Sequence, residues 1–151
     1  MNIVVDGDSC PVKQEIAQTA RTFSVPVLMV ASFDHLIQEI EGVKVARVDR
    51  SAQSADLFIA NHIAPRDIVI THDYGLAALA IGKGCDVLSP RGELYHPGNI
   101  DYLLERRHVQ AKARRAGRHS KGPRAFTAED RVHFQQKLTK LLEDRQEIGC
   151  S

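Results

Sequence analysis

Apolar and polar residues alternate in blocks along the first two thirds of this chain. Four short runs, at residues 3–5, 27–31, 67–71 and 85–88, have the length and apolar character of buried strands, and residues 43–48 alternate apolar and polar as a further strand. Between them, apolar residues recur three and four positions apart, which is the spacing of one helix face. These segments cover residues 11–23, 33–40, 54–62 and 76–80. Alternating strands and helices predict parallel β-α-β units with right-handed crossovers, and therefore an α/β fold.

The last third of the chain has a different pattern. Asn99 is placed to cap a helix that runs into an arginine-rich stretch. Thr127 and Asp130 have the spacing of a capping box, in an acidic form, before a final helix. Its apolar residues lie on one side and are Phe134, Leu138, Leu141 and Ile148. We expect this stripe to pack on the sheet of the same chain rather than on a partner. The prediction is one domain with an α/β core at 1–95, a basic helix and loop at 99–124 and a C-terminal helix at 127–148.

Composition and cysteine content favour an ordinary globular protein. Hydrophobic residues make up 43% of the chain, which is enough for a packed core. The longest apolar run, at 25–32, is too short to span a bilayer. We expect no secretion signal, because the amino-terminal residues include neither a basic segment nor a cleavable apolar stretch. The three cysteines form neither a disulfide framework nor a zinc pattern. We therefore expect a cytoplasmic protein without a membrane anchor.

The net charge of +1 conceals an asymmetry. Residues 106–124 contain eight Lys or Arg and no acid, so the rest of the chain has 12 basic residues against 19 acidic ones. A charge run is usually the solvated face of a helix, but one of this length and single sign also forms an electrostatic footprint for nucleic acid. We expect RNA or another nucleic acid as a partner. The candidate phosphate contacts in this stretch are Arg106, Arg107, Arg114 and Arg115.

Four aspartates lie where predicted strands end or helices begin. Asp6 and Asp73 come at or just past the ends of two apolar strands, Asp8 is two residues beyond Asp6, and Asp56 lies in the first turn of a helix. Functional residues of open parallel sheets collect at the carboxyl ends of the strands. Oxygen ligands without His or Cys favour Mg²⁺ or Mn²⁺, which activate water and neutralise a scissile phosphate. The four are therefore predicted as metal ligands and catalytic residues of an enzyme that acts on phosphodiesters.

Each of three aspartates also has a purely structural explanation. Asp8 and Asp73 are placed to cap the helices that follow them. Asp56 would favour the positive end of its helix dipole. Asp6 has no capping role, and this makes it the strongest candidate of the four.

Several neighbouring residues are weaker candidates. Ser9, Lys13 and Thr71 could contact a substrate phosphate or a metal-bound water, although helix caps and a surface lysine explain them better. His72 could support the site from beside the last aspartate. Cys10 precedes a helix, where a thiolate is favoured, but no arginine follows at the spacing of a cysteine phosphatase.

Four segments together resemble the YaiI/YqxD family of uncharacterised bacterial proteins. They are Val-Asp-Gly-Asp-Ser-Cys-Pro-Val-Lys, Ser-Ala-Asp, Ile-Val-Ile-Thr-His-Asp-Tyr-Gly-Leu-Ala and Gly-Pro-Arg-Ala-Phe-Thr-Ala-Glu-Asp-Arg. Typical members begin Asp-Ala-Asp-Ala-Cys-Pro, so Gly7 and Ser9 depart from the pattern, whereas all four aspartates match. The family is similar in fold to PIN and NYN domains, which are Mg²⁺- or Mn²⁺-dependent ribonucleases. The resemblance implies a PIN-like three-layer α/β/α fold, with a mostly parallel sheet of about five strands, and a ribonuclease activity.

Two other functions fit some of the same residues. Asp6 and Asp8 also have the spacing that opens the haloacid-dehalogenase phosphatases, with Asp6 as nucleophile and Ser32 as a later hydroxyl. Those enzymes usually add a late pair of acids, and here only Asp73 is available. The third hypothesis is a non-catalytic RNA-binding or adaptor protein on a PIN-like scaffold, whose basic segment carries the function. All three hypotheses are compatible with a monomer or an oligomer.

Overall fold

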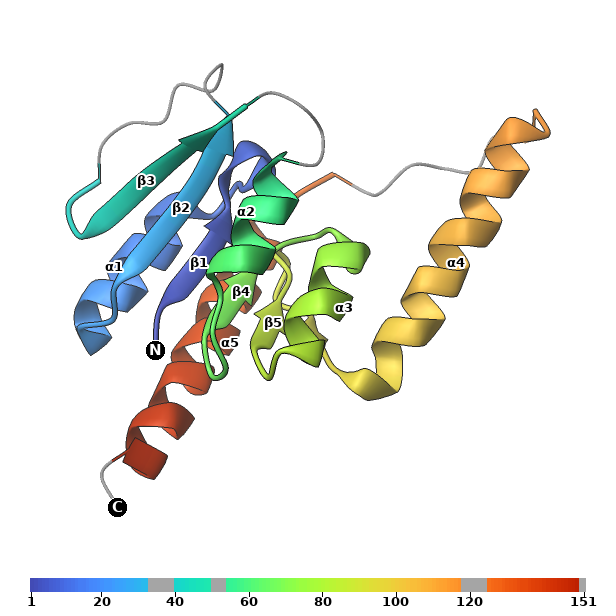
Figure 1. Ribbon diagram of the computed structural model, residues 1–151. Helices are drawn as coiled ribbons and strands as arrows, with labels where there is room; N and C mark the ends of the chain where they lie inside the picture. The colour runs from blue at the N-terminus through green and yellow to red at the C-terminus, as the bar shows by residue number, and fades with distance from the viewer. Residues whose placement is uncertain (33–39, 50–53, 118–124, 150–151) are drawn as a thin grey trace.

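A six-stranded sheet forms the centre of the computed structural model, which describes residues 1–32, 40–49, 54–117 and 125–149 (Figure 1). The strand order is β3-β2-β1-β4-β5-β6. The strands are β1 (Ile3–Asp6), β2 (Val27–Ser32), β3 (Val43–Val48), β4 (Ile68–Ile70), β5 (Asp86–Leu88) and β6 (Leu94–Tyr95). The first five pair in parallel, and β6 pairs antiparallel with β5. The predicted mostly parallel sheet is confirmed.

Helices cover both faces of the sheet and make three layers (Figure 1). The helical elements are a 3-10 turn η1 (Gly7–Ser9) and the helices α1 (Lys13–Phe23), α2 (Ser54–His62), α3 (Tyr74–Gly82), α4 (Pro97–Arg115) and α5 (Ala128–Gly149). One face of the sheet shares a hydrophobic cluster with α1 and α5, and the other face shares a second cluster with α2 and α3. α4 packs against α3. The predicted three-layer α/β fold is therefore confirmed.

The central strands β1, β2 and β4 are apolar up to their last residues because both of their faces are covered. In β1, Ile3 and Val5 belong to the cluster with α1 and α5, and Val4 belongs to the cluster with α2 and α3. This alternation is the two-residue period of a strand. All three side chains are at most 2% exposed. Asp6 is the first polar residue of β1, so the strand carries its acid to the edge of a packed core.

The sheet has one strand more than the sequence predicted. β6 comprises only Leu94 and Tyr95, too few residues to leave a periodic pattern. It forms because the chain turns back sharply after β5, with the Ser89 amide donating to the Glu93 carbonyl at 2.8 Å. Gly92 makes this turn at a φ of +89°, and a Cβ there would lie 2.5 Å from the His133 ring. The short antiparallel strand is thus fixed by turn geometry.

The final helix packs within the chain, as predicted. The Thr127 hydroxyl accepts from the Asp130 amide at 3.2 Å, and Asp130 Oδ2 accepts from the Thr127 amide at 3.0 Å. This reciprocal pair is the expected capping box. Arg91 also donates to Asp130 at 2.8 Å, which ties the start of α5 to the turn after β5. The buried stripe of α5 consists of Phe134, Leu138 and Leu142, with Leu141 partly buried beside it.

The start of α4 differs from the prediction. The helix begins at Pro97, not after Asn99. Proline is well suited to a first helical position, and the His96 ring accepts from the Gly98 amide at 3.0 Å as the cap. Asn99 instead reaches back to accept from the His96 amide at 2.9 Å.

Two predicted segments lie wholly or largely outside the described residues. The helix expected at 33–40 is one of them, and Ile40, its only described residue, is not helical. The other is the basic loop after Gly117, of which 118–124 are not described. Within the described ranges, no helix is both long enough and apolar enough to cross a bilayer.

Candidate functional site

The acidic residues gather where the strand order reverses. From β1 the chain moves outward through β2 and β3, then returns across the sheet to β4, which lies on the other side of β1. In open α/β sheets the ligand crevice lies at this reversal, outside the carboxyl ends of the strands. Asp6 is the last residue of β1, and Asp73 is the third residue after the end of β4. The structure therefore places both residues at the predicted edge.

Thr71 links these two positions. Its hydroxyl donates to Asp6 Oδ2 at 3.3 Å and accepts from the Asp73 amide at 3.1 Å. The side chain is only 1% exposed. A hydroxyl so enclosed and doubly engaged is poorly placed to contact a substrate phosphate, which argues against the predicted role. Its observed effect is to hold the Asp6 carboxylate and the loop after β4 together.

Asp73 has two partners. Its Oδ1 accepts from the Leu76 amide at 3.0 Å and caps α3, as its structural explanation predicted. The same oxygen lies 3.7 Å from Arg107 Nη1 of α4. The side chain of Asp73 is still 30% exposed. Capping therefore fixes this carboxylate at the edge without burying it.

Asp8 does not cap α1, so that explanation was wrong. The residue before α1 is Val12, which makes no side-chain cap bond. Asp8 lies in η1, and its Oδ1 accepts from the Ser32 amide at the end of β2 at 2.8 Å. This bond draws the turn after β1 towards the neighbouring strand. Asp56 lies in the first turn of α2, where the sequence placed it.

Burial is the main influence on Asp6. Desolvation raises the pKa of its carboxyl, and the nearby charges of Asp8 and Asp73 raise it further. The His72 charge and the hydrogen bond from Thr71 oppose this rise. The net pKa lies above the ordinary value of 3.8. Asp6 is thus a half-buried carboxyl whose ionised form is destabilised by its surroundings.

Asp56 interacts with the same charges. Desolvation raises the pKa of its carboxyl, followed by the charges of Asp73 and Asp6, while Arg107 and His72 lower it. The carboxylates of Asp6, Asp56 and Asp73 are therefore near enough to repel one another. Repulsion of this kind is relieved by a positive charge nearby, and Arg107 and His72 act on Asp56 in this way.

We expect Asp6→Asn to stabilise the metal-free protein at neutral pH. Because the folded pKa of Asp6 is raised, the native state binds more protons than the unfolded state between 3.8 and that pKa. The free energy of unfolding then falls as pH rises through this interval. Above the folded pKa, the ionised carboxyl destabilises the native state by its full amount. Asparagine does not ionise, so the variant escapes this loss. Urea unfolding in EDTA should show its advantage at neutral pH and a shrinking difference below pH 3.8. A difference that stays constant with pH would contradict the expectation.

The donor set is chemically suited to a hard cation, but it is not a closed cage. Carboxylate oxygens are the ligands that Mg²⁺ and Mn²⁺ prefer. In the ranges described, no three His, Cys, Asp or Glu side chains converge closely enough to hold an ion. One oxygen each of Asp8 and Asp73 is already bound by a backbone amide. An ion here would draw part of its coordination from water or substrate, as Mg²⁺ usually does.

The remaining candidates near η1 are weaker. Cys10 is buried, and burial raises the pKa of its thiol to about 11, so it is no reactive thiolate. Lys13 is half-buried at the start of α1. The side chain of Ser9 lies outside the description, and its predicted phosphate contact stays a prediction.

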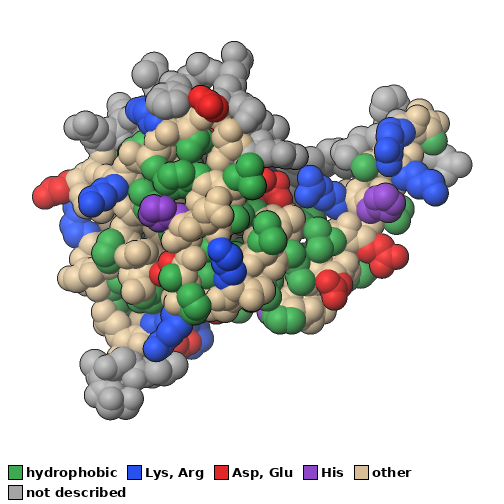
Figure 2. All heavy atoms as spheres, in the orientation of Figure 1, with side chains coloured by type: hydrophobic (Ala, Val, Ile, Leu, Met, Phe, Trp, Pro, Cys, Tyr) green, Lys and Arg blue, Asp and Glu red, His purple; other side chains and the backbone are tan. Residues whose placement is uncertain are grey.

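The basic residues follow α4 away from the body. Figure 2 shows Lys and Arg side chains gathered on the end of α4 that projects in Figure 1. Arg106, Arg107, Lys112 and Arg115 are all exposed. The side chain of Arg114 is not described. Of the described basic residues on α4, Arg107 makes the ion pair with the acidic edge noted above.

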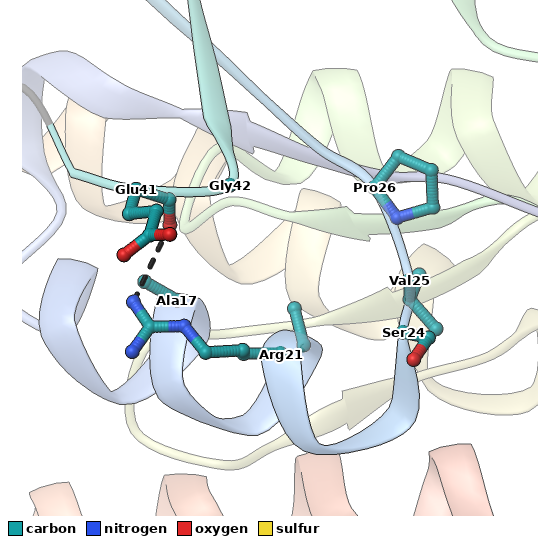
Figure 3. A pocket seen from close by; sticks show the side chains of 8 residues that line it. Ala17, Arg21, Ser24, Val25, Pro26, Glu41 and Gly42 are labelled. Atoms are coloured by element: carbon teal, nitrogen blue, oxygen red, sulfur yellow. Dashed lines mark hydrogen bonds between the residues drawn. The ribbon is translucent and has the colours of Figure 1, made fainter.

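A hollow of about 290 Å³ lies far from these residues, before β2 and β3 begin (Figure 3). Arg21 lines it and donates to the Glu41 carbonyl at 3.4 Å. The carboxyl edge lies at the opposite ends of the same strands. The hollow is also slightly smaller than most small-molecule sites. It is therefore separate from the acidic residues.

Comparison with known proteins identifies close relatives. The model of a family described as "Uncharacterized BCR, YaiI/YqxD family" matches residues 4–144. A UPF0178 protein of Halalkalibacterium halodurans is 46% identical, over 95% of this chain and 91% of its own. A UPF0178 protein of Bacillus velezensis is 44% identical, over 97% and 88%. Rae1 (YacP) from Bacillus subtilis has a crystal structure that aligns with a TM-score of 0.46 and 19% identity, over 96% of this chain and 99% of that one. Structural likeness at that level is too low to assign a shared fold or activity.

Proposed function

The chain belongs to the YaiI/YqxD family, and from this premise we propose that it is a metal-dependent nuclease that hydrolyses RNA at the carboxyl edge of its sheet. The observation that carries the proposal is the position of Asp6. This acid ends a buried central strand at the reversal of strand order, and its pKa is raised by burial and by two other carboxylates. Perturbed carboxyls in such places are typical of functional sites.

A structural role explains Asp6 less well than its neighbours. Asp73 caps a helix and Asp8 holds the end of β2, and both bonds stabilise the fold. The Thr71 hydroxyl donates a hydrogen bond to Asp6, and the effect of burial on the pKa outweighs that of this bond. A cation bound by Asp6 would explain best why the chain carries a carboxylate that destabilises the metal-free fold.

Mg²⁺ or Mn²⁺ is the cofactor that we propose, held by Asp6, Asp56 and Asp73 with Asp8 as a ligand or as the group that orients water. When bound, such an ion supplies an activated water and neutralises charge on the scissile phosphate. Few protein ligands suffice, because Mg²⁺ commonly takes one or two carboxylates together with waters and substrate phosphates. Thr71 would keep the Asp6 carboxylate in a fixed orientation through its 3.3 Å hydrogen bond.

RNA is the proposed substrate because α4 carries positive charge from beside the acidic edge, at Arg107, out along the projecting helix. Exposed Arg106, Lys112 and Arg115 would neutralise backbone phosphates along the projecting helix. Arg107 connects that helix with the acids. The haloacid-dehalogenase alternative has less support, since Ser32 is buried and its amide is bound by Asp8.

A non-catalytic RNA-binding protein is the second candidate. The observation that favours it is the lack, in the described parts of the chain, of three converging metal-ligating side chains. The acids would then serve the fold, and α4 would carry the function. Both candidate functions involve RNA as a partner, but only the nuclease requires a metal ion.

Incubation with end-labelled single-stranded RNA, in Mn²⁺ and in EDTA, tests the proposal. We expect cleavage in Mn²⁺ only, and RNA binding that weakens steeply with salt because phosphate contacts release counterions. RNA binding without cleavage, together with no Mn²⁺ binding at millimolar concentration, would favour the second candidate. A phospho-aspartate trapped at Asp6 would favour the phosphatase.

A further inference from the structure

The outer surface of α2 and α3 is apolar where a solvated helix face is usually polar. Leu57 of α2 is 59% exposed, and Leu79 of α3 is 56% exposed. The two helices contact each other in one layer, and Figure 2 shows hydrophobic side chains gathered over both of them. Single exposed leucines are ordinary, but an apolar patch shared by neighbouring helices is typical of a surface that another molecule covers.

The composition of α3 indicates the same. Over Tyr74–Gly82 the helix contains no charged residue, and its residues after the tyrosine are Gly, Leu, Ala and Ile. Helices that are apolar on every side are normally buried on every side. On the inner side of α3, Leu76, Ala77 and Ala80 are buried, whereas Leu79 on the outer side meets solvent. The described part of the chain therefore leaves open an outer side whose composition is that of a buried surface.

The charges at the ends of the two helices suit a second copy of the chain. Both helices begin at the carboxyl edge of the sheet and end at its amino edge, because each one connects two parallel strands. Each has an acid at its start, which is Asp56 in α2 and Asp73 in α3, and a basic residue at its end, which is His62 in α2 and Lys83 in α3. When two copies meet face to face with antiparallel helices, the acidic start of each helix lies opposite the basic end of the same helix in the other copy.

We propose that this protein forms a two-fold symmetric dimer, in which α2 and α3 of one copy pack antiparallel on α2 and α3 of the other. Two-fold dimers are the commonest protein oligomers, and their interfaces are more apolar than the remaining surface. Ala78 lies midway between Asp73 and Lys83 in sequence, so the pairing of these charges places Ala78 near the symmetry axis. Leu79 of one copy then lies beside Ala78 of the other. The dimer does not depend on the proposed nuclease activity.

Other occupants suit this surface less well. RNA is bound through Lys and Arg, and neither Ser54–His62 nor Tyr74–Gly82 contains one. An unrelated protein could cover an apolar patch. However, the change from acid to base along each helix is complementary to itself under a two-fold axis, and this favours a second copy.

The molar mass at sedimentation equilibrium, measured from micromolar to submillimolar protein, tests the dimer. We expect the wild type to rise from 16.8 kDa towards twice that mass. Leu79→Glu places a charge at both halves of the interface and should raise the dissociation constant by more than about tenfold. Val132→Glu makes a similar change at an apolar site that is 56% exposed on α5, across the sheet, and should alter the constant by less than about twofold.

A cysteine at position 78 tests the antiparallel arrangement. Cys10 and Cys85 are buried, and Cys150→Ser removes the third thiol. In that background, Ala78→Cys should give a disulfide-linked dimer under mild oxidation, because a residue near a two-fold axis faces its own copy. Gly82→Cys lies one turn further along α3, where a Cβ would meet no atom within 4 Å. It should not cross-link, because antiparallel helices separate it from its copy by about 12 Å along the axis.

Several results would overturn the proposal. A wild type that stays at 16.8 kDa at every concentration would exclude the dimer. A dimer that Leu79→Glu and Val132→Glu weaken equally would lie on another surface, and cross-links at both position 78 and position 82 would indicate parallel helices. If urea unfolding shows that Leu79→Glu is not folded, Leu57→Glu on the neighbouring helix replaces it with the same expected loss. These measurements use neither metal nor RNA, so a monomer would leave the proposed nuclease untouched.

Discussion

Asp6→Asn should abolish Mn²⁺-dependent cleavage of RNA while the protein stays folded. The substitution keeps the shape of the side chain and removes the charge that would hold the metal. A metal supplies several kcal/mol of transition-state stabilisation, so the rate should fall by more than about 100-fold. Cleavage of end-labelled RNA at saturating Mn²⁺ measures the effect.

Asp49→Asn provides the matched control. Asp49 follows β3 at the same edge of the sheet and is exposed, so it gives the same change in charge outside the proposed site. Its activity should stay within about twofold of the wild type, because exposed charges are screened. Full activity of Asp6→Asn would remove the acidic site from the mechanism. Urea denaturation shows whether Asp6→Asn loses activity by unfolding. At neutral pH, we expect Asp6→Asn to be at least as stable as the wild type.

Phe134→Ala should have the largest effect on stability. Phe134 is 0% exposed and packs in the cluster between α1, α5 and the sheet. Truncation of a buried phenylalanine costs about 3–5 kcal/mol, a large share of the roughly 5–15 kcal/mol that stabilises a typical domain. Urea unfolding followed by circular dichroism should therefore show a much lower midpoint.

Val132→Ala, on the same helix, is the control for this measurement. Val132 is 56% exposed, so its truncation should change the free energy of unfolding by no more than about 0.5 kcal/mol. If the two variants unfold alike, α5 does not belong to the core. A loss confined to Phe134→Ala confirms that the last helix completes one face of the sheet.

The sequence predicted elements whose cause is local. Apolar runs such as residues 27–31, which lie in β2, mark strands because both faces of a central parallel strand are buried. Thr127 and Asp130 predicted the start of α5 because the side chain of each binds the backbone amide of the other, three residues away. The edge that carries Asp6 and Asp73 followed from strand and helix alternation alone, since parallel strands share their carboxyl ends.

Contacts between distant segments could not be predicted. Thr71 meets Asp6 only because β4 lies beside β1, and its hydroxyl looked like an ordinary cap. Asp8 binds the Ser32 amide across 24 positions of sequence, so the cap prediction failed. The approach of Arg107 to Asp73 depends on how α4 rotates against α3, and no local pattern encodes that rotation.

The place of α5 in the core has a consequence for how the protein is made. Residues of the first strand, such as Ile3, share a cluster with Phe134 and Leu142, near the other end of the chain. During translation the part of this sheet face that α5 covers must stay open until the residues of α5 have left the ribosome, although α1 is made earlier. Contacts that join such distant residues also form slowly. Nascent chains would thus expose the apolar surface that Phe134, Leu138 and Leu142 later cover.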